Sequence, residues 1–500
     1  MFSPQMMKNK NLMVASNSRS TSSASAWLRH ISHGPNALGS SLGTDSSMIA
    51  ANDRCNTEKV VNDPFIVRYP VNNAASTSNF HKDSSMIAAN NRRSFHSTSL
   101  ARKQQQQQQQ QQPESGAMQD EYGEMTSEGY TYVHDVPFEL ENGDVLEEAQ
   151  LRYQTYGHLN EARDNVLVVC HALTGNASLD AWWGGVLGPG EAFDTDKYFI
   201  VCSNILGSCY GSTSPISINP KTSQPYGKDF PDISVKDTVR LQLNMLVNEL
   251  QVNSIKSVIG GSFGGMQAME FAVQAGASAD SPYAAEGFFG GDDNKQPLVR
   301  SVIPIACGAA HTAWQIAISE TQRQAIYADP MWESDGFQAT QGLAVARQIG
   351  MVSYRTHAGY NQKFGRDMQA PKDGQKVKDV AYGKDANWKV KSYLQYQGVK
   401  FLTRFDPITY VKMTEQMDSH NVARGRGASL ADVLSYVNIP SLILGIDSDI
   451  LYPLREQEEL NCFMPNSELH VIHSDDGHDG FLLEQDEVSK HIQEFLKKHK

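Results

Sequence analysis

Hydrophobic and polar positions from residue 130 onwards follow two patterns that predict β-strands. Residues 130–136 and 150–156 alternate between the two classes, as strands with one face towards solvent do. Residues 165–169 and 198–202 are instead continuous apolar runs, which are typical of strands buried on both faces of a parallel sheet. Strand patterns return later in the chain, at residues 301–306, 441–446 and 468–472.

Apolar residues spaced three and four apart predict amphipathic helices between these strands. In residues 237–253, for example, Val239, Leu243, Leu246 and Leu250 fall on one face. Strands that alternate with helices indicate an α/β fold, in which a mostly parallel sheet carries helices on both faces. The other helical patterns are residues 313–327, 342–354, 391–401, 409–417 and 488–498.

Four of these helical patterns follow one another without an intervening strand, so they predict a helical insertion in the α/β core. We therefore expect the first part of the core at residues 119–308, a helical lid insertion at residues 309–435, and the second part of the core at residues 436–500. Two polar stretches, residues 276–294 and 372–389, are expected at the surface.

The first 118 residues differ in composition and predict a leader outside the core. Residues 1–112 hold twelve Lys and Arg against five Asp and Glu, are rich in Ser and Asn, and end in nine consecutive glutamines. An Arg- and Ser-rich, acid-poor leader is typical of a mitochondrial transit peptide, which predicts the mitochondrial matrix as the location. Arg92, Arg93 and Phe95 resemble a matrix cleavage signal, with cleavage expected within residues 94–103. A merely disordered basic tail is the alternative.

Charge and hydropathy exclude two broad kinds of partner. The net charge is −13, and the chain without residues 1–112 carries −20, so nucleic acid is not expected as a partner. No apolar run approaches the ~20 residues that span a bilayer, so no membrane insertion is expected. The six cysteines include no Cys-x-x-Cys pair, and a metal site is therefore not indicated.

A serine among glycines is the first candidate for chemistry. Ser262 lies in the sequence Gly-Gly-Ser-Phe-Gly-Gly, which reads Gly-x-Ser-x-Gly. A short β-branched run precedes it and a helix-forming run follows it, which is the strand-turn-helix context of a nucleophile elbow. Glycines permit the close approach of strand and helix that exposes the serine hydroxyl. A tight glycine-rich turn with an incidental serine is the alternative.

A serine nucleophile needs a base and an acid that orients the base. Asp449 follows the predicted strand 441–446, and His478 follows the predicted strand 468–472. The order Ser262, Asp449, His478 is the order of α/β-hydrolase folds. Asp447 competes with Asp449 by spacing. His473 competes with His478, but its place at the strand end predicts a packed side chain, whereas His478 lies in a flexible loop between two glycines.

An acyl-transfer site also needs donors for the developing oxyanion. The N–H of Phe263, directly after the nucleophile, is the first expected donor. The second is an N–H from the loop His171–Gly175, which leaves the carboxyl end of the strand 165–169, and Leu173 is the expected residue.

Several motifs together resemble the homoserine/serine O-acyltransferases of the α/β-hydrolase superfamily, across roughly residues 130–498. The resemblance implies that Ser262 is the nucleophile, Asp449 the acid and His478 the base, and that the fold is an α/β-hydrolase fold with an inserted lid. The motifs are His171–Gly175, Trp182–Gly190, Cys202–Gly207, Gly211–Thr213, Gly260–Gln267, Ser448–Pro453 and Gly477–Leu482.

The same resemblance implies substrate-binding residues, at Arg347, Asp479 and Tyr354. An amino-acid acceptor needs a cation for its carboxylate and an anion for its ammonium group, which Arg347 and Asp479 would supply. It also implies acetyl-CoA or another acyl-CoA as co-substrate, no permanently bound cofactor, and a homodimer.

Departures from the family pattern concern the acceptor. Phe263 stands where homoserine enzymes usually carry Met, Met269-Glu-Phe271 replaces Leu-Glu-Trp, and the loop 176–181 is short. With the leader, these features resemble the mitochondrial serine O-acetyltransferase branch. We therefore expect transfer of acetyl from acetyl-CoA through acyl-Ser262 to L-serine, giving O-acetyl-L-serine for cysteine synthesis.

Four other functions stay open from the sequence. L-homoserine is the alternative acceptor, for methionine synthesis, and a succinyl group is the alternative in transfer to serine. An esterase or thioesterase would use the same triad without an amino-acid acceptor. A non-catalytic binding protein would keep the fold without the chemistry.

Overall fold

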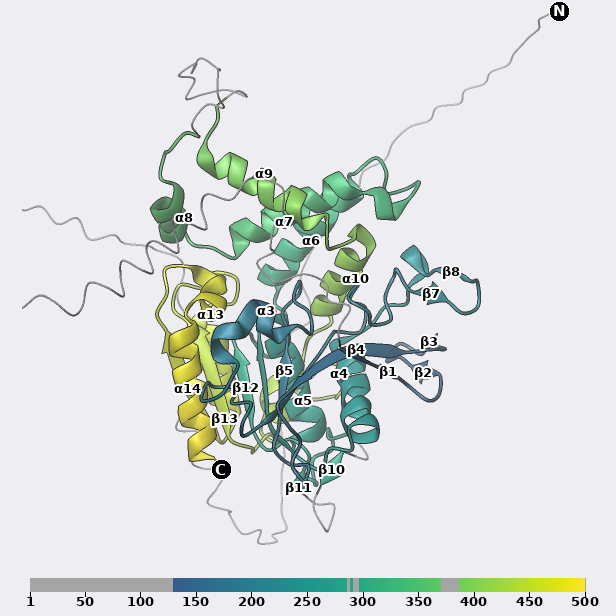
Figure 1. The fold of residues 1–500 in the computed structure, drawn as a ribbon, viewed down its shortest axis with the longest axis vertical. Helices are drawn as coiled ribbons and strands as arrows, with labels where there is room; N and C mark the ends of the chain where they lie inside the picture. Colours follow the sequence, from purple (N-terminus) through teal and green to yellow (C-terminus); the bar gives the residue numbers. More distant parts are fainter. Residues whose placement is uncertain (1–128, 286–287, 291–295, 370–385, 500) are drawn as a thin grey trace, which may run out of the picture. The chain divides into compact units, whose positions relative to one another are not determined.

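The computed structural model describes residues 129–285, 288–290, 296–369 and 386–499 (Figure 1). The predicted leader at residues 1–118, its cleavage region and most of the polar stretch 372–389 lie outside the described residues, so those predictions stay predictions. No helix of the described part has the length and apolar composition that crossing a membrane requires.

Eight strands form the central sheet, in the order β1-β4-β6-β5-β9-β12-β13-β14. β4 is antiparallel to both of its neighbours, and the strands from β6 to β14 are parallel. The mostly parallel sheet predicted from the sequence is thus confirmed. The strands are β1 (Tyr130–Val133), β4 (Gln150–Tyr156), β5 (Val166–Cys170), β6 (Phe199–Ser203), β9 (Ile255–Gly261), β12 (Val302–Ile305), β13 (Ser441–Ile446) and β14 (Ser467–Ile472). Three short hairpins pair β2 (Phe138–Glu139) with β3 (Val145–Leu146), β7 (Ile218–Asn219) with β8 (Gln224–Pro225), and β10 (Phe289–Gly290) with β11 (Gln296–Pro297).

The continuous apolar run of β5 reflects burial on both faces of the sheet. Val166, Val168 and Cys170 belong to one hydrophobic core, and Leu167 and Val169 belong to the other. Successive side chains of a strand point to opposite faces, so a strand between two cores needs an apolar residue at every position.

Helices cover both faces. α4 (Val235–Asn244), α5 (Phe263–Ala275) and α12 (Leu454–Phe463) contribute to the first core, and α3 (Leu179–Trp183) and α14 (Gln485–Lys498) contribute to the second. The α-helical part of the predicted helix 237–253 ends at Asn244, because the next turn, Met245–Glu249, is π-helical.

Between β12 and β13 the described chain is helical. α7 packs on both α6 and α9, and the three helices lie together above the sheet in Figure 1. The bounds of α6 match the predicted helix 313–327, whereas α8 and α12 were not predicted. The helices of this stretch are α6 (Ala313–Tyr327), α7 (Thr340–Ser353), α8 (His357–Phe364), α9 (Lys389–Phe401), α10 (Pro407–Asp418) and α11 (Leu430–Leu434). The short α13 (Gly480–Leu483) precedes α14.

Candidate active site

Ser262 occupies a sharp turn between β9 and α5. Its backbone has φ 58° and ψ −123°, a region that residues with a Cβ atom rarely adopt. The Ser262 N–H donates a hydrogen bond to the carbonyl of Ile305, 2.9 Å away on β12, which fixes the turn to the sheet. A strained serine at the carboxyl end of a central strand is the geometry of a nucleophile elbow.

Two glycines make this turn possible. A Cβ atom on Gly264 would lie 2.0 Å from the carbonyl oxygen of Cys170, and one on Gly260 would lie 2.2 Å from the carbonyl oxygen of Gly264. Both contacts are with backbone atoms, which cannot move aside as a side chain can. The glycines flanking Ser262 are therefore required by the close approach of α5 to β9 and β5.

His478 and Asp449 form a buried hydrogen-bonded pair. His478 Nδ1 lies 2.7 Å from Asp449 Oδ2. Asp449 Oδ1 accepts hydrogen bonds from the N–H groups of Leu451, at 2.8 Å, and Tyr452, at 2.9 Å. These three contacts fix the carboxylate, so that His478 donates from Nδ1 and its Nε2 is the acceptor atom.

The competing pair lies at the surface. His473 Nδ1 is 2.8 Å from Asp447 Oδ2, but the His473 side chain is 77% exposed. The prediction of a packed His473 is wrong, because the strand end turns its side chain to solvent, where the Asp447 carboxylate raises the pKa of His473. The cavity that Ser262 lines includes His478, and neither Asp447 nor His473 lines it.

His478 is held more firmly than a flexible loop would hold it. It lies in a short 3-10 helix, Gly477–Asp479, and is buried. The rings of Tyr452, Phe481 and Tyr354 surround it, with centroids 5.1, 5.5 and 6.0 Å from that of the imidazole. The expected flexibility is therefore wrong, since aromatic packing restricts the orientation of the ring.

Five of the eight predicted site residues line one narrow cavity of about 40 Å³. Apolar side chains from other elements, including Met417 of α10 and Leu451, complete its wall. Within the described residues, the N–H groups of Phe263 and Leu173 donate no hydrogen bond, as an oxyanion hole requires. The five residues are Leu173, Ser262, Tyr354, His478 and Asp479.

The loop that carries Leu173 is fixed at two points that sequence reasoning missed. His171 is fully buried, and its Nε2 accepts a hydrogen bond from the Ile205 N–H at 3.2 Å. Burial lowers the pKa of His171 to about 4, so its ring is neutral and suited to this acceptor role. On the other side, Arg404 Nη1 donates to the Thr174 carbonyl at 2.7 Å.

Asp479 already has a cationic neighbour. Arg355 Nε lies 2.6 Å from Asp479 Oδ2, and Arg355 Nη1 lies 2.6 Å from Asp476 Oδ1. Sequence reasoning missed Arg355, whose only signal was its position directly after Tyr354. Any ammonium group that binds Asp479 must therefore share this carboxylate with a guanidinium group.

Three predicted site residues do not line the cavity: Asp449, which is hydrogen-bonded to His478, Phe263, which directly follows Ser262, and Arg347. Arg347 is buried on α7, and its guanidinium lies 5.1 Å from the ring centroid of Phe401. Arg347 is not one of the described residues that line the cavity. In the described part of the chain, no cluster of three His, Cys, Asp or Glu side chains is placed to hold a metal ion.

The strand order, the elbow and the His–Asp pair define an α/β-hydrolase, and a family model described as the alpha/beta hydrolase fold matches residues 165–485. The chain belongs to this family and, within it, to the homologues of homoserine O-acetyltransferases. The homoserine O-acetyltransferase of Trichormus variabilis is 44% identical over 368 residues, which cover 73% of this chain and 92% of the relative. That of Salinibacter ruber is 44% identical over 354 residues, covering 70% and 92%.

A solved structure agrees in fold. The crystal structure of homoserine O-acetyltransferase from Bacillus anthracis aligns with a TM-score of 0.62 at 23% identity and covers 73% of this chain and 96% of that one. The predictions of an α/β-hydrolase fold and of an acyltransferase enzyme are confirmed. The preference for the serine branch finds no support among these relatives.

Proposed function

We propose that the protein is a homoserine O-acetyltransferase, which transfers the acetyl group of acetyl-CoA to the hydroxyl of L-homoserine. The observation that carries the proposal is the cavity lined by Ser262 and by His478, whose Nδ1 pairs with Asp449, in a chain 44% identical to a homoserine O-acetyltransferase over 92% of its length. Homoserine thereby replaces serine as the expected acceptor.

The first half-reaction forms an acetyl-enzyme. His478 Nε2 takes the proton of the Ser262 hydroxyl, whose oxygen attacks the thioester carbonyl of acetyl-CoA. The N–H groups of Phe263 and Leu173 hold the oxyanion of the tetrahedral intermediate. Collapse of the intermediate breaks the carbon–sulfur bond, and His478 returns the proton to the departing CoA thiolate.

The second half-reaction transfers the acetyl group to the acceptor. His478 removes the proton of the homoserine hydroxyl, whose oxygen attacks the acetyl-Ser262 carbonyl. Collapse releases O-acetyl-L-homoserine, and His478 returns the proton to Ser262. Asp479 lines the cavity together with His478, and in this proposal it binds the acceptor ammonium group while Arg347 binds the acceptor carboxylate.

Exclusion of water is what separates this function from that of an esterase. Leu451, Met417 and Leu482 give the cavity that Ser262 lines an apolar wall. Such a wall disfavours water as the second nucleophile and leaves the acetyl-enzyme for the amino-acid hydroxyl.

The first prediction tests this function by assaying L-homoserine and L-serine against acetyl-CoA and succinyl-CoA. We expect CoA release to be fastest with homoserine and acetyl-CoA, and to fall by at least about 10³-fold in Ser262→Ala because the nucleophile is lost. Release of CoA at a rate independent of any acceptor would instead identify a thioesterase. Faster turnover of L-serine than of L-homoserine would show that L-serine is the acceptor.

A further inference from the structure

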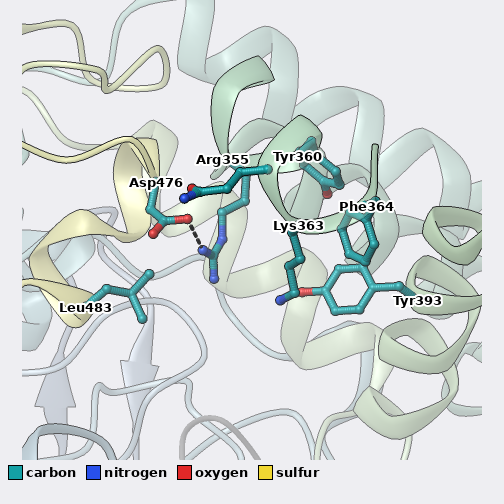
Figure 2. Close-up of a pocket in the computed structure, with 9 residues that line it drawn as sticks. Arg355, Tyr360, Lys363, Phe364, Tyr393, Asp476 and Leu483 are labelled. Carbon is teal, nitrogen blue, oxygen red and sulfur yellow. Dashed lines mark hydrogen bonds and ion pairs between the residues drawn. The ribbon is translucent and has the colours of Figure 1, made fainter. Parts of the chain in front are cut away.

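A second cavity lies next to the catalytic one, between the lid helices and the segment that carries His478. Its volume is about 370 Å³, far larger than that of the catalytic cavity. Figure 2 shows its two sides: Asp476 and Leu483 face Tyr360, Lys363, Phe364 and Tyr393 across it. The first two residues belong to the core, and the others belong to α8 and α9.

The lid side combines aromatic rings with a cation. Phe364 lies beside Tyr393 and Tyr360, with ring centroids 4.9 and 5.7 Å away. Lys363 Nζ lies 4.7 Å from the ring centroid of Tyr393 and 5.6 Å from that of Phe364. Within the described residues, no carboxylate forms a salt bridge with Lys363, so its charge is available to an anionic ligand.

The two cavities share a wall. Arg355 lines the larger cavity, Asp479 lines the catalytic one, and the ion pair between them, at 2.6 Å, stands at the boundary. Consecutive residues also divide between the cavities, since Leu482 lines the catalytic one and Leu483 the larger one. A ligand bound in the larger cavity is thus adjacent to the site of acyl transfer.

We propose that the larger cavity binds the phosphate-bearing adenine nucleotide end of the acyl-CoA donor. This proposal rests on the proposed function, which makes an acyl-CoA the donor. Adenine has a flat aromatic face that stacks on Phe364 or Tyr393, and Lys363 pairs with a phosphate group. The flexible pantetheine arm then carries the thioester past the Arg355–Asp479 pair to Ser262.

The second prediction measures nucleotide binding without catalysis. Adenosine 3′,5′-bisphosphate is titrated calorimetrically into the full chain, into Lys363→Glu, and into Lys490→Glu as a matched charge reversal on an exposed residue of α14. We expect Lys363→Glu to weaken binding about tenfold and Lys490→Glu to leave it unchanged. Absence of binding to the unaltered protein, or equal effects of the two reversals, would overturn the proposal whether or not the enzyme acetylates homoserine.

A kinetic comparison separates the nucleotide site from the chemistry. In Lys363→Glu and Tyr393→Ala, we expect the KM for acetyl-CoA to rise about tenfold while kcat stays near its original value. Turnover of N-acetyl-S-acetylcysteamine, a thioester without the nucleotide, should be unchanged in both variants. An equal loss with both thioesters would contradict a nucleotide role, and a change confined to the KM for homoserine would assign the cavity to the acceptor.

Discussion

Two Asp–His pairs in this chain have nearly the same geometry and very different surroundings. Asp449 and His478 are 2.7 Å apart and buried, whereas Asp447 and His473 are 2.8 Å apart and largely in water. Only the buried pair is screened from solvent and adjoins Ser262. The surface pair is therefore a natural control for the buried one.

The third prediction compares Asp449→Asn with Asp447→Asn. Oδ1 of residue 449 accepts two backbone N–H bonds, so the new amide group would face His478 and force the proton of the imidazole onto Nε2. We expect kcat to fall on the order of 10³- to 10⁴-fold in Asp449→Asn and to stay within about twofold in Asp447→Asn. Equal activities of the two variants would remove Asp449 from the mechanism, and circular dichroism checks that both variants fold.

At the scale of single residues, chain order was enough to predict that the three proposed triad residues follow strands. Ser262, Asp449 and His478 each follow a strand, and parallel strands bring their carboxyl ends to one edge. Arg355 was missed because its carboxylate partners, Asp476 and Asp479, lie more than a hundred positions away in the sequence. A local sequence pattern cannot predict an ion pair between residues so far apart.

At the scale of elements, the sequence predicted helices and strands that bury much apolar surface and missed helices that bury little. The bounds of β13 and α6 match their predictions. In contrast, α8 buries none of its residues fully, and α12 buries only Gln457 and Leu460. A helix that buries so little of its surface leaves almost no apolar period in the sequence, so these two could not be recognised.

The fourth prediction concerns the contact between α5 and the sheet. Gly264→Ala would place a methyl group 2.0 Å from the Cys170 carbonyl oxygen, whereas a Cβ atom on Gly184 has no neighbour within 4 Å. We expect Gly264→Ala to lower the free energy of unfolding by roughly 3 kcal/mol, because backbone must shift. Gly184→Ala should change it by less than about 1 kcal/mol, in the stabilising direction. Urea denaturation measures both, and similar midpoints would contradict the packing described here.

Buried neutral histidines make the stability of the whole protein depend on pH. Burial lowers the pKa of both His171 and His420 to about 4, from 6.5. Below pH 6.5 the unfolded chain binds protons at these positions, and the native protein does so only near pH 4. Their contribution to stability is thus complete above pH 6.5 and is lost progressively as the pH falls to about 4.

The fifth prediction isolates one of these histidines. His420 Nε2 contacts the Gly308 carbonyl at 3.0 Å, a contact that a glutamine amide can replace without titrating. We expect the unfolding free energy lost between pH 7.5 and pH 5 to be about 2 kcal/mol smaller in His420→Gln than in the unaltered protein. Urea denaturation at the two pH values gives the comparison, and identical losses would show that His420 does not titrate as described.

Arg404 links the helical segment between β12 and β13 to the loop that carries Leu173, the expected oxyanion donor. Its hydrogen bond to the Thr174 carbonyl holds the residue next to Leu173. Without this bond, the loop at Leu173 would keep its contact at His171 and lose the one at Thr174. The helical segment over the sheet and the backbone next to Leu173 are therefore coupled through the Arg404 side chain, although Arg404 itself does not line the cavity of Ser262.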